Sequence, residues 1–356
     1  MNHETNQITR VVVRLPNWLG DVVMCVPALH AVRRILPDAH VTVVSRPGCS
    51  DIFIDCDFVD EVLVYDRVSL TSTWNQARIW RRRRFDVALL FQNAFEAAAI
   101  AFLARVPKRI GYDTERRGPL LTHAVNLPNW KDERHESLYY LNIVTEFEKA
   151  LLSRASSGIP APQPWLDVSP ARKEKAREIL FKNGLPPGRP LVLLCPGSIN
   201  SRAKRWPAEH YAELTDRLRQ TGFEVALIGS SGEIDVSERV SRLAQQKPIL
   251  LTGDTTVAEA VAIVSIADLL ITNDTGPAHI GAALNTPTIV IFGPTNPLTT
   301  YPLSARAEII RQPPDCAPCM LRDCPIDHRC MTAITPEQVF EKAAALLAHD
   351  RIEITA

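Results

Sequence analysis

The stretch LLITNDTGPAH, residues 269 to 279, is typical of a buried strand that turns directly into a helix, and it decides how this chain folds. Its first four residues are apolar or β-branched, and residues 273 to 276 supply a turn. Pro277 stands where a first helical residue is expected, because the first amides of a helix have no partner within it. Those free N–H groups and the helix dipole favour a phosphate. The stretch therefore predicts a strand, a turn and an anion-binding helix start.

Four residues of this stretch are candidates for contact with such a ligand. They are Asp274, Thr275, Gly276 and His279. An alternative interpretation is that Asp274 or Thr275 merely caps the helix, while His279 packs on the sheet.

The N-terminal part of the chain predicts a second unit of the same kind. A strand is expected at residues 11–15, a loop PNWLGD at 16–21, and one helix at 22–36. Apolar runs predict further strands at residues 41–44, 62–65 and 87–91. This alternation is typical of a parallel sheet covered by helices, whose ligands bind beyond the carboxyl ends of the strands. Asp21 is the carboxylate best placed there, with a role as helix N-cap as the alternative.

The second half of the chain repeats this order of elements. Residues 153 to 170 are rich in Ser, Ala, Pro and Gly, which indicates a linker and divides the chain into domains 1–168 and 169–356. A strand at 191–194 leads into the loop CPGSINSRAKRWP, where Ser198, Asn200 and Lys204 offer donors to an oligophosphate. A basic surface loop is the alternative. Further elements are expected as strands at 225–228 and 288–292, a capped helix from 256, and a final helix near 336.

Charge and hydropathy exclude some classes of protein. Lysine plus arginine equals aspartate plus glutamate, 40 each, so no overall field attracts nucleic acid. A local excess of six positive charges lies between Arg78 and Arg117, and it suits an anionic acceptor, a membrane surface or a solvated helix face. The longest apolar run, residues 97–104, is far short of the roughly 20 residues of a spanning helix. With no signal peptide recognised, we expect a cytosolic protein.

Four of the eight cysteines are close together in sequence. Cys316, Cys319, Cys324 and Cys330 have the pattern C-x2-C-x4-C-x5-C. Structural zinc or another metal, reduced thiols and disulfides are the alternatives. Because no partner His or Asp can be identified, a catalytic thiol is not expected.

Together these features suit the transfer of a sugar from a nucleotide. The helix start and Lys204 would stabilise a nucleoside diphosphate leaving group without a bridging metal. Asp21 would remove the proton of the attacking hydroxyl, and a single displacement would invert the anomeric carbon. An oxidoreductase is disfavoured, since neither first turn has G-x-G-x-x-G.

Several motifs resemble those of one family over nearly the whole chain. They are NWLGD at 17–21, CPG at 195–197, AKRWP at 203–207, TNDTGPAH at 272–279 and FGPT at 292–295. In this order they resemble the ADP-heptose:lipopolysaccharide heptosyltransferases, glycosyltransferase family 9, and most of all their heptosyltransferase II branch.

This resemblance implies a GT-B architecture, an α/β fold of two Rossmann-like parallel-sheet domains that face a central cleft. The N-terminal domain would take the acceptor, an inner-core heptose of lipopolysaccharide, and the C-terminal domain would take ADP-heptose. The final helix would pack back toward the N-terminal domain. By motif, Asp21 is the general base, Lys204 contacts the diphosphate, and Asp274, Thr275, Gly276 and His279 line the donor site. Glu233 is the nearest candidate for an adenosine contact.

The resemblance also bears on cofactors and location. It implies no required cofactor, leaves stimulation by a divalent cation open, and suggests contact with the cytoplasmic face of the inner membrane. The alternatives are a heptosyltransferase for a different acceptor, a nucleotide-sugar epimerase, or a non-catalytic protein that binds a sugar nucleotide or a metal.

Overall fold

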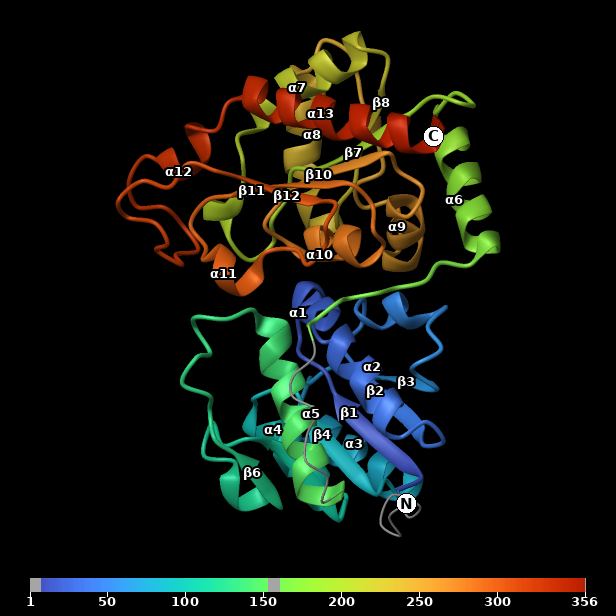
Figure 1. Ribbon diagram of the computed structural model, residues 1–356, viewed down its shortest axis with the longest axis vertical. Helices are drawn as coiled ribbons and strands as arrows, with labels where there is room; N and C mark the ends of the chain where they lie inside the picture. The colour runs from blue at the N-terminus through green and yellow to red at the C-terminus, as the bar shows by residue number, and fades with distance from the viewer. Residues whose placement is uncertain (1–7, 153–160, 356) are drawn as a thin grey trace. The chain divides into compact units, whose positions relative to one another are not determined.

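The computed structural model describes residues 8–152 and 161–355 (Figure 1). The chain divides into two compact units, Met1–Leu166 and Asp167–Ala356. Each unit holds one six-stranded sheet in which all strands are parallel. This confirms the predicted α/β class with two parallel-sheet domains.

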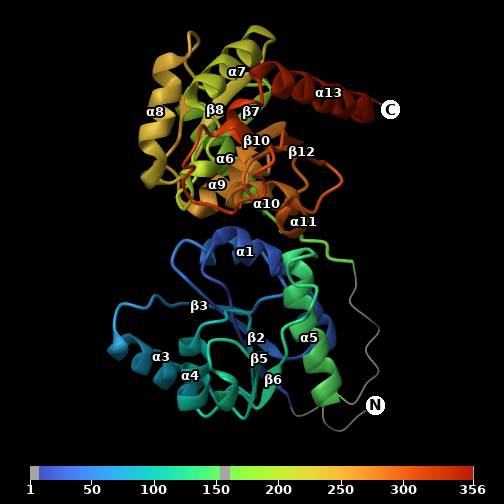
Figure 2. The ribbon, with the colours of Figure 1, turned by 90° about the vertical axis from the view of Figure 1, so that its left-hand side faces the viewer.

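The sheet of unit 1 has the strand order β3-β2-β1-β4-β5-β6. Its strands are β1 Arg10–Arg14, β2 His40–Ser45, β3 Glu61–Val64, β4 Val87–Leu90, β5 Lys108–Tyr112 and β6 His123–Val125. Its helices are α1 Leu19–Met24, α2 Val26–Ile35, α3 Leu70–Arg83, α4 Phe95–Leu103 and α5 Glu136–Leu152. Helix α3 packs on α4, and α5 packs on both α1 and α2. Figure 2 shows α3 and α4 on one side of the sheet and α5 on the other.

The sheet of unit 2 has the order β12-β11-β10-β7-β8-β9. Its strands are β7 Leu191–Cys195, β8 Glu224–Leu227, β9 Ile249–Leu250, β10 Leu269–Asn273, β11 Thr288–Phe292 and β12 Ala307–Arg311. Its helices are α6 Pro170–Lys182, α7 Ala208–Gln220, α8 Ile234–Leu243, α9 Val257–Val264, α10 Gly276–Ala283, α11 Pro297–Thr300, α12 Arg329–Thr332 and α13 Pro336–Thr355. Within the unit, α13 packs on α7 and β11.

The central strands are apolar because helices cover both faces of each sheet. Every residue of β7, β10 and β11 is buried, as are all four of β4. The strands expected from apolar runs are therefore confirmed. Four strands were not expected, and β5 shows why: its charged start, Lys108 and Arg109, and its Gly111 hide a short strand near the sheet edge.

The strand order of each sheet reverses direction at one point. In unit 1 this switch lies between β1 and β4, and in unit 2 it lies between β7 and β10. The loops that follow the two strands diverge there, so the carboxyl edge of the sheet is open to a ligand. The segments that follow β1, β7 and β10 carry the predicted catalytic and donor-binding residues.

The predicted helix at residues 22–36 is wrong in one respect, because the structure has two helices there. Pro27 lies in the first turn of α2, and proline removes a helical hydrogen bond and clashes with the preceding turn. The helix is therefore interrupted at Cys25. Helix α1 already starts at Leu19, so Asp21 lies in its first turn and Trp18, not Asp21, is the N-cap. No helix within residues 8–152 and 161–355 is both long and apolar enough to cross a membrane.

Candidate functional site

One buried amide joins the two loops at the switch point of unit 2. Asn273, at the end of β10, is fully buried. Its Nδ2 donates to the carbonyl oxygens of Pro196 and Gly197, both at 3.0 Å. Its Oδ1 accepts from the Trp206 amide and the Tyr211 hydroxyl, both at 3.1 Å. All four hydrogen-bonding positions of the amide are thus used, which fixes the CPG turn against β10.

A buried ion pair lies beside this amide. The Asp274 side chain is only 3% exposed, and its Oδ2 accepts from Lys204 Nζ at 2.9 Å and from Thr295 Oγ1 at 2.6 Å. Lys204 Nζ also donates to the Asp274 carbonyl at 3.0 Å. Burying a carboxylate is costly unless a cation and hydrogen bonds compensate it, and both are present here. Loops that follow β7, β10 and β11 therefore converge on a single carboxylate and hold one cation in place.

Helix α10 begins next to this pair, with Pro277 in its first turn as predicted. Thr275 is the N-cap, but its hydroxyl donates to the Asn273 carbonyl at 3.3 Å rather than capping the helix. The Asp274 carboxylate is held by Lys204 and Thr295. The capping role considered for these two side chains is therefore not what the structure shows. The His279 side chain is buried one turn inside α10.

Glu233 lies at the same edge of the sheet, against the CPG turn. Its Oε2 accepts from the Ser230 amide at 2.9 Å and the Ser230 hydroxyl at 2.7 Å. A Cβ added to Gly197 would lie 2.1 Å from Glu233 Oε1, so any side chain at position 197 would displace Glu233. Of the other predicted donor residues, Ser198 is buried in this loop and Asn200 is exposed.

The switch point of unit 1 is held by its own polar network. Asn17 Oδ1 accepts from Gln92 Nε2 at 3.1 Å and from Arg14 Nη2 at 3.4 Å, which ties the NWLGD loop to the loop after β4. The fully buried Arg117 donates to the Gln92 carbonyl and, at 3.1 Å, to Asn93 Oδ1. Burial lowers the pKa of Arg117 to about 10. These bonds fix the turn from which α1 presents Asp21.

A second carboxyl group lies near Asp21 that the sequence did not single out. Burial raises the pKa of Glu136, in the first turn of α5, to about 7. The positive charge of Lys131 opposes this rise, whereas the negative charges of Asp21 and Asp132 add to it, and a hydrogen bond with Tyr140 lowers it. Asp21, the predicted base, therefore has a second carboxyl group, that of Glu136, close to it.

A family model matches the greater part of this chain. The model for glycosyltransferase family 9 (heptosyltransferase) matches residues 74–329. The chain belongs to this family. It is 29% identical to lipopolysaccharide heptosyltransferase 2 of Salmonella typhimurium, over 96% of this chain and 100% of that protein. It is 30% identical to lipooligosaccharide heptosyltransferase 2 of Haemophilus influenzae, over 94% and 98% of the two chains.

A solved structure agrees with these relationships. The structure of Escherichia coli ADP-heptose lipopolysaccharide heptosyltransferase II superimposes with a TM-score of 0.83, at 26% identity, and covers 96% of this chain and 100% of that one. The predicted glycosyltransferase family is thus confirmed, and with it the GT-B class of fold.

In this family 9 chain the cysteine-rich segment contacts the Lys204 turn through its backbone. The amide of Ala203 donates to the Arg322 carbonyl at 2.9 Å, and the Ser201 hydroxyl donates to the same carbonyl at 3.2 Å. His328 Nε2 bonds the Ala203 carbonyl at 2.6 Å. A Cβ on Gly293 would lie 3.2 Å from Cys330 Sγ. The segment thus supports the loops that hold Lys204 and Thr295.

The four thiols of this segment do not form a metal site. Across the described ranges 8–152 and 161–355, no group of three or more His, Cys, Asp or Glu side chains could hold a metal ion. All eight cysteines are free, and three of these four are at least partly exposed. Burial and the neighbouring thiols raise the pKa of Cys330 to about 11. Of the alternatives from sequence, reduced thiols fit this geometry and zinc does not.

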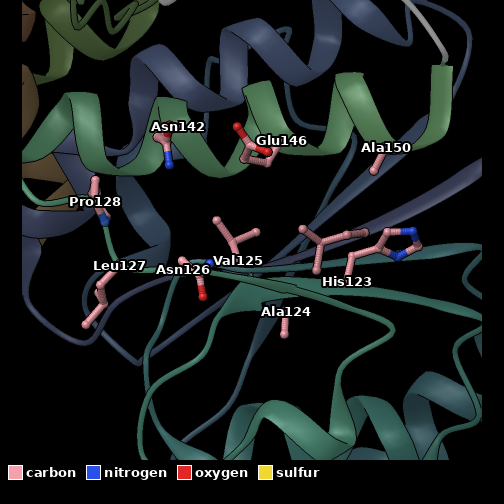
Figure 3. A pocket seen from close by; sticks show the side chains of 10 residues that line it. His123, Ala124, Val125, Asn126, Leu127, Pro128, Asn142, Glu146 and Ala150 are labelled. Carbon is pink, nitrogen blue, oxygen red and sulfur yellow. The ribbon is translucent and has the colours of Figure 1, made fainter.

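This family 9 chain also has two cavities. One of about 500 Å³ lies between β6 with its following loop and α5; Figure 3 shows Asn142, Glu146 and Ala150 of α5 across from residues 123–128. The other, of about 350 Å³, is lined by Arg202, Arg205 and Arg239 among others. Neither is lined by Asp21, Lys204 or Asp274.

Proposed function

We propose that this chain transfers L-glycero-D-manno-heptose from ADP-heptose to an inner-core heptose of lipopolysaccharide, with inversion at the anomeric carbon. Relatives named heptosyltransferase 2 align over nearly the full chain, and the related solved structure carries ADP-heptose in its name. The observation that carries the proposal is the Lys204–Asp274 pair beside the first turn of α10. It fixes a cation next to the start of a helix, where the helix dipole also favours the charge of a departing diphosphate.

The donor would bind along the loops of unit 2, the nucleotide-sugar domain of the proposal. Its diphosphate would lie at Thr275 and Gly276, with Lys204 neutralising the charge that develops on the leaving oxygen. Further contacts would come from Ser198, Asn200, Asp274 and His279 of the same loops and helix. Glu233, held by Ser230 beside the CPG turn, would accept hydrogen bonds from the ribose. Because a lysine and a helix start carry the charge, the proposal requires no metal.

The acceptor would bind to unit 1, where Asp21 acts as general base. Asp21 would take the proton of the acceptor hydroxyl as that oxygen bonds to the anomeric carbon and the bond to the diphosphate breaks. One displacement from the face opposite the diphosphate gives an inverted product.

The exposed face of α3 offers a surface for the membrane in which a lipid-linked acceptor lies. Leu70 and Trp74, one helical turn apart, are 74% and 58% exposed, and Arg78, Arg81 and Arg82 continue along the same face. Apolar side chains followed by arginines suit the boundary of a bilayer with anionic headgroups. We therefore propose that this face binds the cytoplasmic surface of the inner membrane.

Vesicle co-sedimentation tests this contact. We expect the protein to bind phosphatidylglycerol vesicles and Trp74→Ala to weaken binding several-fold, while Trp165→Ala, which removes another exposed tryptophan, leaves it unchanged. Equal binding of the two variants, or no binding by wild type, would remove α3 from the proposal and leave the transfer reaction untouched.

Substitution of the base tests the reaction itself. We expect Asp21→Asn to remove most heptose transfer while ADP affinity stays within about threefold, because the change keeps the shape and removes only the base. NMR analysis of the product linkage identifies the acceptor sugar. Wild-type transfer by Asp21→Asn would refute this mechanism, and a linkage to another core position would favour a heptosyltransferase for a different acceptor.

A further inference from the structure

Helices α1 and α5 of unit 1 face each other through two pairs of side chains. The helices pack together, and both Figures 1 and 2 show the start of α5 beside α1. Asp21 in α1 and Cys25, the residue that ends this helix, are one turn apart, and the Cys25 amide donates to the Asp21 carbonyl at 3.0 Å. Glu136 and Tyr140 are one turn apart on α5. Residues four apart lie on the same face of a helix, so each helix presents a carboxyl group with a second polar group behind it.

Tyr140 links the two helices. Its hydroxyl is hydrogen-bonded to Glu136 and to Cys25, and the side chains of Cys25 and Tyr140 are buried. The ring of Tyr140 is held by Phe91, whose centroid lies 5.6 Å away, and by Tyr139 at 5.8 Å. Glu136 is therefore fixed on the side of α5 that faces α1, close enough to Asp21 for the two charges to interact.

The surroundings of Glu136 contain more negative than positive charge. Asp21 and Cys25 face it from α1, and Asp132 and Lys131 lie in the segment before α5. His135 precedes it and accepts from the Ser137 amide at 3.1 Å, while Tyr112 and Tyr139 interact with it electrostatically. Lys131 is the one lysine among these groups, and two negative charges on Asp21 and Glu136 would repel each other.

We propose that Glu136 is a positioning residue of the acceptor site that acts through Asp21, the two carboxyl groups holding one proton between them. This inference rests on the proposed function, because it gives Asp21 the role of base. In the state with one proton, Glu136 keeps it and Asp21 is ionised. Loss of that proton places a second negative charge beside Asp21, which increases the affinity of Asp21 for the acceptor proton.

The pair predicts a particular dependence of turnover on pH. As pH rises through about 7, Glu136 ionises and Asp21 becomes a stronger base, so kcat should rise by about threefold or more. Glu136→Gln keeps the shape and the contact with Tyr140 but cannot ionise. The variant should therefore lose this rise, whereas Glu136→Asp should retain a rise. Glu146→Gln, a matched change ten residues further along α5, should leave the profile unchanged.

A titration of Glu136 separates this inference from the proposed function. Protein labelled with 13C at the glutamate carboxyl carbons, compared with the Glu136→Gln variant, identifies the signal of Glu136. We expect it to titrate near pH 7 in wild type and at a lower pH in Asp21→Asn, where one neighbouring charge is gone. A signal that does not move in Asp21→Asn would overturn the pairing, whatever reaction the protein catalyses.

The kinetic and spectroscopic results together distinguish the carboxyl pair from the role of Asp21 as base. If the signal shifts in Asp21→Asn but Asp21→Asn still transfers heptose, the carboxyl pair exists and the proposed function of Asp21 is wrong. If Asp21→Asn is inactive and Glu136→Gln keeps the wild-type pH profile, Asp21 is the base and the role of Glu136 is wrong.

Discussion

Replacing Lys204 by methionine should separate the structural role of this residue from its proposed role in donor binding. The substitution removes the only cation bonded to Asp274 Oδ2 among the described residues and leaves Thr295 as the partner of that oxygen. Breaking a fully buried ion pair costs about 3–5 kcal/mol. The Lys204 side chain is 26% exposed, so water reaches the site and we expect about 2–3 kcal/mol.

This loss should be visible in thermal unfolding of unit 2. At about 2–4 °C per kcal/mol for a unit of this size, Lys204→Met should melt about 4–12 °C below wild type. The double variant Lys204→Met/Asp274→Asn removes the unpaired charge, so its melting temperature should recover most of that difference. ADP binding, measured by calorimetry, should be weak in both variants, because neither has the lysine.

Lys342→Met is the matched control in the same unit. Lys342 pairs with Glu308, and the two side chains are 39% and 38% exposed. Exposed pairs contribute about 0–1 kcal/mol, so this variant should melt within about 4 °C of wild type and bind ADP normally. The reasoning fails if Lys204→Met melts as high as Lys342→Met, or if the double variant melts no higher than Lys204→Met.

Three further results follow from the geometry. Gly197→Ala should displace Glu233 and weaken ADP binding about tenfold or more by calorimetry, whereas Gly232→Ala, with 3.9 Å of clearance, should bind normally; equal affinities would place Glu233 outside the donor site. The raised pKa of Glu136 means that the folded state holds the Glu136 proton more tightly than the unfolded state does, so the stability from this group falls as pH rises from 4.5 to about 7. Glu136→Gln should therefore have a higher melting temperature than wild type at pH 8 but not at pH 4.5. A metal chelator should change neither the melting temperature nor turnover, and a loss of either on chelation would show that a metal is bound.

The sequence predicted most of the central strands because a strand covered on both faces must be apolar along its length. The run from Leu269 and the proline at position 277 were sufficient to predict β10 and the start of α10. Shorter strands such as β6, three residues at the sheet edge, lack such a run. The break at Cys25 could have been predicted from Pro27, since proline inside an apolar helical pattern marks a helix boundary.

The site was predictable as a set of loops but not as a set of contacts. Strand order decides which loops meet, so nothing local could show that Lys204 bonds a carboxylate 70 positions away. The sequence predicts Asn273 as a turn residue, whereas in the structure its side chain makes four buried hydrogen bonds. Its position at the end of a buried strand was the available signal. Glu136 gave no local signal, because its proximity to Asp21 depends on the packing of α5 on α1.

The most direct test of the proposed reaction is the release of ADP from ADP-heptose by the purified protein, measured with and without a heptose-containing lipid acceptor. We expect release that depends on the acceptor, together with binding of ADP in preference to UDP and GDP. Preference for UDP or GDP, or binding of no nucleotide at all, would contradict the proposed transfer of heptose.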